Sequence, residues 1–170
     1  MRFEELATRR LPAVLRFAAV LTGDRASAED VVQEVLIRVH QRWDKIGGLD
    51  QPELYIRKMI VNEFISSRRK LPRLVPLGRD SEIDDRVTSD YAARHAERDA
   101  LLGELAKLPR RQRAVLVLRY YEGLPDTAIA AMLGCAPGTV RSSASRALAT
   151  LRIEMSGPHP ASALPEGRKP

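Results

Sequence analysis

The chain has 170 residues, a net charge of +6 and 44% hydrophobic residues, which is an ordinary composition for a globular protein. Its single cysteine, Cys135, excludes an intrachain disulfide and fits a reducing, cytoplasmic location. No apolar stretch approaches the length that spans a bilayer, so we expect no membrane insertion. The basic charge is compatible with a nucleic-acid partner but does not specify one.

The first block of the chain, residues 1–70, is predicted to form amphipathic helices. The first helix contains Pro12, which should kink it or mark a new start. A second helix is predicted to open at Ser27, with Asp30 three residues later as a capping-box-like pair. A third starts at Pro52, because proline is favoured in the first turn of a helix. Apolar residues recur along these segments at spacings of three and four, which indicates a buried core.

Two polar surfaces stand out in this first block. On the second helix, an acidic and polar patch lies off the apolar face, and composition alone makes it a solvated surface: Asp30, Gln33 and Glu34. On the third helix, cations, an amide and other side chains recur at helical spacing: Arg57, Lys58, Val61, Asn62, Ile65, Ser66 and Arg69. Such a face suits single-stranded nucleic acid, since cations neutralise phosphates and a displaced base can be hydrogen-bonded. Taken alone, this pattern is not specific.

The rest of the chain is predicted to hold a linker, a second helical block and a tail. Residues 71–92 change abruptly from basic to proline-rich and then to acidic, which predicts a flexible linker. Residues 93–155 form the second helical block, and residues 156–170 are expected to be disordered. No strand-like alternation is convincing, so the predicted fold class is all-α, with two small helical domains.

A run of arginines lies at the start of one helix in the second block. Pro109 begins that helix, and its first turns carry Arg110, Arg111 and Arg113. Cations at a helix N-terminus oppose the helix dipole, so we expect a compensating group. A phosphate is one candidate; the alternative is a plain solvated face.

Residues 124–147 have the pattern of a helix-turn-helix, whose second helix enters the DNA major groove. Gly134 can adopt the left-handed conformation that closes the first helix. The second helix, opened by Pro137, carries no acid before residue 148 and leaves these side chains free: Thr139, Arg141, Ser142, Ser145 and Arg146. Arginine can form paired hydrogen bonds to guanine, and the hydroxyl of serine or threonine can form hydrogen bonds to bases or phosphates. The alternative is a helical hairpin with a solvated basic face.

Catalysis finds no support in the sequence. The histidines are scattered, no His/Cys cluster has metal-ligand spacing, and no glycine-rich phosphate loop is present. We therefore expect no catalytic residues, no metal and no cofactor.

Three motifs together resemble the small extracytoplasmic-function (ECF, group IV) sigma factors of the sigma-70 family, the promoter-recognition subunits of bacterial RNA polymerase. Residues 28–34 look like the family's D-x-x-Q-E stretch. Residues 108–124 resemble its L-P-x-x-x-R…L-R-Y-x-E-G-L signature. Residues 138–142 match its G-T-V-[RK]-S recognition helix.

The resemblance implies a role for each surface. Residues 1–70 become sigma region 2, in which Asp30, Gln33 and Glu34 dock on core RNA polymerase. The third helix reads the −10 element and the melted non-template strand, through Arg57, Lys58, Asn62 and Arg69. Residues 93–155 become region 4, which reads double-stranded −35 DNA through Thr139, Arg141, Ser142, Ser145 and Arg146. An anti-sigma factor is the expected regulatory partner.

The sequence departs from the family at several positions and leaves other functions open. Tyr55 stands where a tryptophan is usual, and Pro125 and Ala136 replace the residues, often serine, that cap the two helices of the motif. The alternatives are a stand-alone helix-turn-helix transcriptional regulator, or a sigma-like decoy that binds polymerase or an anti-sigma factor without reading DNA.

Overall fold

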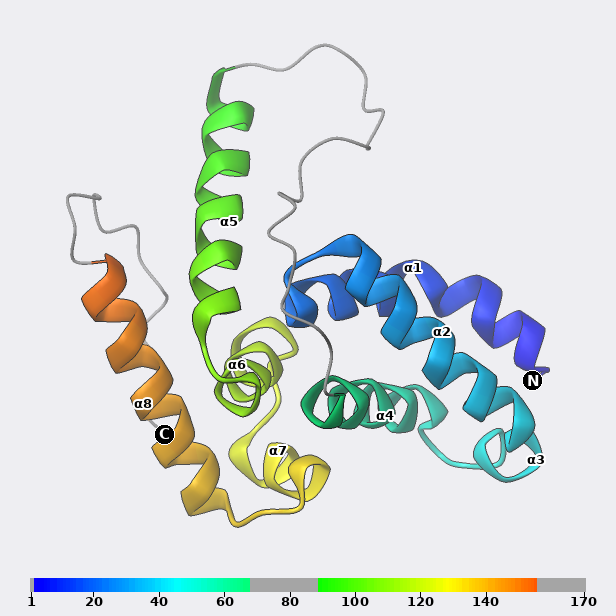
Figure 1. Cartoon of the computed structure of the whole chain (residues 1–170). Coiled ribbons are helices and arrows are strands. Elements are labelled where there is room, and N and C mark those ends of the chain that lie inside the picture. The colour runs from blue at the N-terminus through cyan, green and yellow to red at the C-terminus, as the bar shows by residue number, and fades with distance from the viewer. Residues whose placement is uncertain (1, 68–88, 156–170) are drawn as a thin grey trace.

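The computed structural model describes residues 2–67 and 89–155, with side chains over residues 2–67 and 96–152. Of the predicted linker, only residues 89–92 fall within the described part, where they begin a helix. The predicted disordered tail lies outside it. Every element in the described ranges is helical, which confirms the all-α fold class (Figure 1).

The first block consists of α1 (Phe3–Thr22), α2 (Arg25–Gln41), the short α3 (Trp43–Ile46) and α4 (Pro52–Ser66). Helix α1 runs through Pro12 without a new start, so that part of the expectation was wrong. Pro12 is the tenth residue of α1, so it removes one hydrogen bond of the helix, to the Thr8 carbonyl. Both residues are exposed, so water can reach that carbonyl. Pro52 occupies the first turn of α4, as predicted.

The start of α2 differs from the prediction. Asp24, not Ser27, is the N-cap residue, with an extended backbone at φ −149° and ψ 153°. Its carboxylate accepts a hydrogen bond of 2.7 Å from the backbone N–H of Ser27. Aspartate is itself a preferred N-cap residue, and from position 24 its side chain reaches the backbone N–H of Ser27, the third residue of α2.

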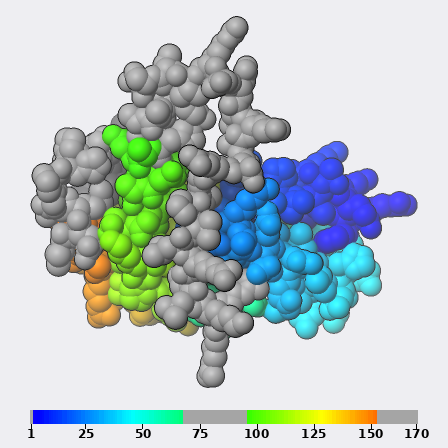
Figure 2. Space-filling model, turned by 45° about the horizontal axis from the view of Figure 1, so that its top comes forward, coloured from blue at the N-terminus to red at the C-terminus, as the bar shows by residue number. Residues whose placement is uncertain are grey.

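The second block consists of α5 (Ser89–Lys107), α6 (Arg110–Leu116), η1 (Val117–Tyr121), α7 (Asp126–Leu133) and α8 (Pro137–Met155). η1 is a π-helical turn that continues α6. Helix α8 packs against α6 and α7, α7 also contacts η1, and α5 lies alongside α8 (Figure 1). The space-filling view shows α5 and α8 on one side of the molecule and the first block on the other (Figure 2).

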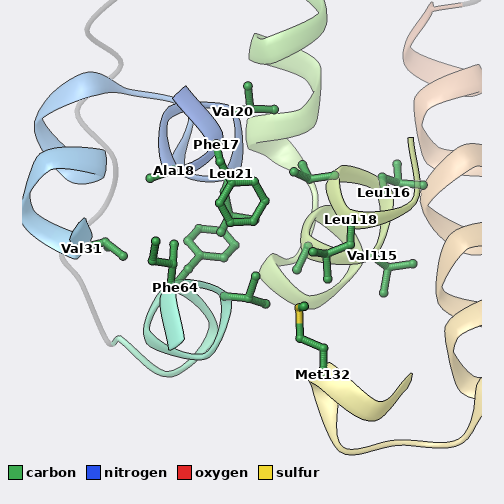
Figure 3. Packing of buried hydrophobic residues seen from close by; sticks show 14 of the residues in the cluster. Phe17, Ala18, Val20, Leu21, Val31, Phe64, Val115, Leu116, Leu118 and Met132 are labelled. Carbon is green, nitrogen blue, oxygen red and sulfur yellow. The ribbon is translucent and has the colours of Figure 1, made fainter. Parts of the chain in front are cut away.

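The two blocks share one hydrophobic core. Phe17 of α1 and Phe64 of α4 lie between the helices of the first block and α6, and Leu118 of η1 belongs to the same core (Figure 3). Phe17 and Leu118 are both 0% exposed. Helix α4 contacts both α6 and α7. The sequence predicts two small domains; in the structure the two blocks pack together.

Candidate nucleic-acid interface

Helix α8, the predicted recognition helix, presents the predicted polar side chains outward. Val140, Ala144 and Ala147 are each 0% exposed and face α6 and α7. The five predicted contact residues lie on the other side of the helix, four of them exposed and Ser142 half-buried: Thr139, Arg141, Ser142, Ser145 and Arg146. The Ser142 hydroxyl donates to the Thr139 carbonyl at 3.0 Å. One open helix face thus carries two arginines and three hydroxyls.

The turn between α7 and α8 has the geometry that the sequence predicts. Gly134 is left-handed, with φ 63° and ψ 43°, and its N–H donates to the Ala130 carbonyl. Pro125 at the start of α7 makes no side-chain cap. Asp126 in the first turn instead forms an ion pair of 2.8 Å with Arg119. A carboxylate at this position complements the helix dipole in place of a cap.

Helix α4 presents only part of the predicted single-strand face. Asn62 is exposed and Lys58 is half-buried. Val61, grouped with them by spacing, is 0% exposed and belongs to the core. Arg57 is engaged in an ion pair with Glu122 of the second block. Arg69 lies outside the described residues.

The acidic patch of α2 borders a groove. Gln33 and Glu34 are exposed, and Glu34 pairs with Arg38 at 2.8 Å. Asp30 is also exposed on this face. Gln33 lines a largely apolar groove of about 580 Å³ between α1 and α2, where Ile37 remains 48% exposed. The patch therefore combines polar groups with accessible apolar surface.

Two of the arginines at the start of α6, Arg110 and Arg113, are compensated by the first block. Arg113 is 5% exposed and donates to the Leu21 carbonyl at 3.2 Å and the Thr22 carbonyl at 3.0 Å. It also donates to Ala106, and its guanidinium lies 5.4 Å from the centroid of the Phe64 ring. These acceptors lie at the C-terminal ends of α1 and α5, where cations are stabilised. For Arg113, neither a phosphate nor open solvent is the compensating group.

Burial changes the electrostatics of Arg113. Desolvation, with a smaller contribution from the positive charge of Arg110, lowers the pKa of Arg113 to about 10. This value remains well above neutral pH, so the guanidinium is charged and its donors need acceptors. Arg110 itself donates to the carbonyls of Phe64 and Ser67 at the end of α4.

Within the described residues, no group of three or more His, Cys, Asp or Glu side chains could hold a metal ion. In the same ranges, no helix combines the length and apolar character needed to cross a bilayer.

Comparison with known families decides what this arrangement is. The family Sigma-70 region 2 matches residues 6–73, and the family Sigma-70, region 4 matches residues 98–151. The chain belongs to the sigma-70 family of RNA polymerase sigma factors. The acidic patch of α2 and helix α4 fall in region 2 of this sigma factor, and the helix-turn-helix falls in region 4.

Several relatives resemble this sigma factor over most of their length. RNA polymerase sigma-E factor of Streptomyces avermitilis is 36% identical over 91% of this chain and 86% of the relative. ECF RNA polymerase sigma factor SigL of Mycobacterium tuberculosis is 36% identical over 82% of this chain and 81% of the relative. Among solved structures, sigma factor RpoE of Bartonella quintana, crystallised with the anti-sigma factor NepR, has a similar fold at 22% identity. Its TM-score is 0.62, and the match covers 92% of this chain and 98% of that one.

Sequence reasoning missed the polar contacts between the two regions of this sigma factor. Glu122 pairs with Arg57 across 65 positions of sequence, and Arg113 reaches α1 from the second block. The only sequence feature that pointed to these contacts was the arginine run at the start of α6. It indicated that a compensating group is needed, but not where in the chain that group lies. Tyr120 and Tyr121, 48% and 49% exposed on η1, were also not singled out.

Proposed function

We propose that this chain acts in the cytoplasm as an ECF-type, group IV sigma factor, without catalytic activity or a cofactor of its own. In this role it joins core RNA polymerase and directs it to promoters through separate −10 and −35 contacts. The observation that carries the proposal is the outward face of α8, where Arg141 and Arg146 are both exposed on a helix-turn-helix whose core-facing side is fully packed.

The −35 contact is assigned to α8. Side chains near the N-terminus of a recognition helix reach base edges in the major groove. Arg141 is the fifth residue of α8, and Thr139 and Ser142 flank it. Arg146 and Ser145 lie more than one turn further along the same open face and suit the phosphate backbone. We therefore assign base reading to Arg141 and backbone contact to Arg146.

The −10 contact is assigned to α4. Asn62 offers an amide that can donate to and accept from the edge of a displaced base, and Lys58 and Arg57 offer charge to the strand. Arg69 is assigned to the same strand by its position in the sequence. Capture of an unstacked base costs a few kcal/mol per step. These contacts need a melted strand and should add little to duplex binding.

The α2 patch is assigned to core polymerase. Asp30, Gln33 and Glu34 form a polar cluster beside the apolar groove, as protein interfaces often combine a polar rim with an apolar centre. The similar fold of RpoE, crystallised with NepR, supports an anti-sigma factor as a further partner.

Run-off transcription with purified core polymerase tests the proposal. A genomic template library should give discrete transcripts only when this chain is added, and charge reversal of Arg141 and Arg146 should abolish them. If the charge-reversed variant still binds core polymerase and still gives the same transcripts, then α8 does not read DNA. Tight binding to a duplex site without polymerase would favour a stand-alone regulator.

A further inference from the structure

A cavity of about 260 Å³ lies where the two blocks meet. Val31 and Phe64, both labelled in Figure 3, form part of its apolar wall. The remaining wall is largely polar, and its polar side chains come from the ends of four helices: Thr22, Asp24, Ser27, Ser67, Arg110 and Arg113. None of these six belongs to the proposed promoter or polymerase contacts, so the cavity is a separate feature of the molecule.

Two guanidinium groups line this cavity and repel each other. Arg113 is 5% exposed, whereas Arg110 is half-buried. Desolvation lowers the pKa of Arg113 to about 10, and the positive charge of Arg110 contributes to the same shift. Both groups remain charged at neutral pH. An anion in the cavity would be attracted to both and would offset their mutual repulsion.

The Nε–H group of Arg113 is a donor that the protein packing does not use. Backbone carbonyls compensate the terminal nitrogens of this side chain. Its Nε–H is buried and has no hydrogen-bond acceptor within the described residues. A buried donor of a charged group is costly without an acceptor. A ligand with several acceptor oxygens, placed in the cavity that Arg113 lines, can supply the missing one.

The start of α2 also favours an anion. Asp24 and Ser27, the N-cap and the third residue of this 17-residue helix, line the cavity. The N-terminus of a helix carries a partial positive charge, which stabilises anions. The hydroxyls of Ser27 and Ser67 are further donors for an oxyanion. The Ser67 hydroxyl already accepts a hydrogen bond of 3.2 Å from Arg110, so it lies beside that cation.

Asp24 restricts which anion fits. Its carboxylate accepts a hydrogen bond of 2.7 Å from the backbone N–H of Ser27, and a carboxylate can accept several. An anion without a proton is only repelled by this group, whereas an anion with a proton can donate to it. At neutral pH, phosphate keeps a proton and sulfate keeps none. The cavity therefore suits phosphate better than sulfate.

We propose that this cavity binds a phosphate group, as free phosphate or as a phosphomonoester, through Arg110, Arg113 and Asp24. Because both blocks line the cavity, the bound phosphate adds to the stability of the whole fold. The site goes beyond the proposed promoter recognition and does not depend on it. It gives the chain a second ligand class, a small phosphate compound, next to nucleic acid and polymerase.

Thermal unfolding of the full chain in sodium phosphate, sulfate and chloride at equal ionic strength tests the site. A ligand that binds the folded state raises the unfolding midpoint with the logarithm of its concentration once it exceeds the Kd. Phosphate and sulfate both stabilise proteins by exclusion from their surfaces, so sulfate measures the non-specific part. We expect an additional rise in phosphate. Equal midpoints in phosphate and sulfate would overturn the proposal.

Two variants assign the effect to this cavity. Arg110→Gln should lose the additional rise, while the matched control Arg111→Gln removes the same charge from the next, exposed residue and should keep it. Asp24→Asn retains a preferred N-cap residue but not the charge, so sulfate should then stabilise the chain as much as phosphate. This second variant decides the matter if Arg110→Gln fails to fold by circular dichroism. An additional rise retained in folded Arg110→Gln, or undiminished discrimination in Asp24→Asn, would overturn the proposal.

Isothermal titration calorimetry with inorganic phosphate and with glycerol 2-phosphate identifies the form of the ligand. A phosphomonoester has a second pKa of about 6 and has lost most of that proton at neutral pH, so it should bind more weakly. Measurable binding of the ester, lost in Arg110→Gln, shows that the site also admits phosphomonoesters. Binding of inorganic phosphate alone restricts the site to the free ion. If neither probe binds, the proposal is overturned.

Discussion

Replacing Arg113 with methionine should destabilise the fold by roughly 2–5 kcal/mol. Methionine keeps the length and apolar body of the side chain but has no donor. The carbonyls of Leu21, Thr22 and Ala106 then lose a charged partner. Buried carbonyls without a partner are costly, and these lie at helix ends that have no other intrahelical donors.

The magnitude follows from two opposing effects. Hydrogen bonds to charged groups contribute about 1.5–3 kcal/mol each, and Arg113 makes three of them, to the carbonyls of Leu21 and Thr22 in the first block and of Ala106 in the second. Against them stands the burial of the charge. The lowered pKa of Arg113, about 10, corresponds to about 3 kcal/mol against the charged form. The difference leaves the guanidinium clearly stabilising.

Urea unfolding followed by circular dichroism measures the effect, with Arg111→Met as the control because Arg111 is exposed. Since burial depresses the folded pKa of Arg113, the penalty on its charge is fully present below pH 10 and is relieved only as the pH rises through that value. The loss in Arg113→Met should therefore be equal at pH 6 and pH 8. A loss below about 0.5 kcal/mol, the range of ordinary surface changes, would refute the assignment of a stabilising role.

Further substitutions test the other surfaces. Asp24→Ala removes the 2.7 Å cap of α2 and should lower the free energy of unfolding by about 1 kcal/mol, while exposed Asp50→Ala should not; equal stability of the two would count against the cap. Gln33→Ala should weaken co-purification with core polymerase while leaving the thermal unfolding midpoint unchanged, and normal recovery of polymerase would contradict the docking role. Asn62→Ala should reduce permanganate reactivity of the melted −10 strand more than closed-complex binding; equal losses at both stages would argue for a general defect.

Local features of the fold were largely predictable from the sequence, because each is set by a few neighbouring residues. Gly134 is the left-handed closure of α7, and Pro52 opens α4, as expected. Asp24 was missed as the cap of α2 because Ser27 is an equally typical N-cap residue, and residue type alone does not choose between them. The π-helical turn at Val117–Tyr121 has no comparable local signature.

The contact between the blocks was not predictable by the same means. The acceptors of Arg113 lie 91 and 92 residues earlier in the chain, at the end of α1. Every residue has a backbone carbonyl, so the side chains at the end of α1 give no sign that these carbonyls accept hydrogen bonds from Arg113. For the recognition helix, by contrast, the buried and exposed residues alternate with the helical period, and the outward position of Arg141 followed directly.

The π-helical turn has a consequence for the length of related chains. Its wider ring takes up one residue more than an α-helical turn, and it is closed here by the N–H of Glu122 donating to the Val117 carbonyl at 3.1 Å. A homologue lacking one residue between positions 117 and 121 would close the same turn as regular α-helix and keep the downstream helices in place. Alignments of related chains should therefore tolerate a single-residue gap at this point.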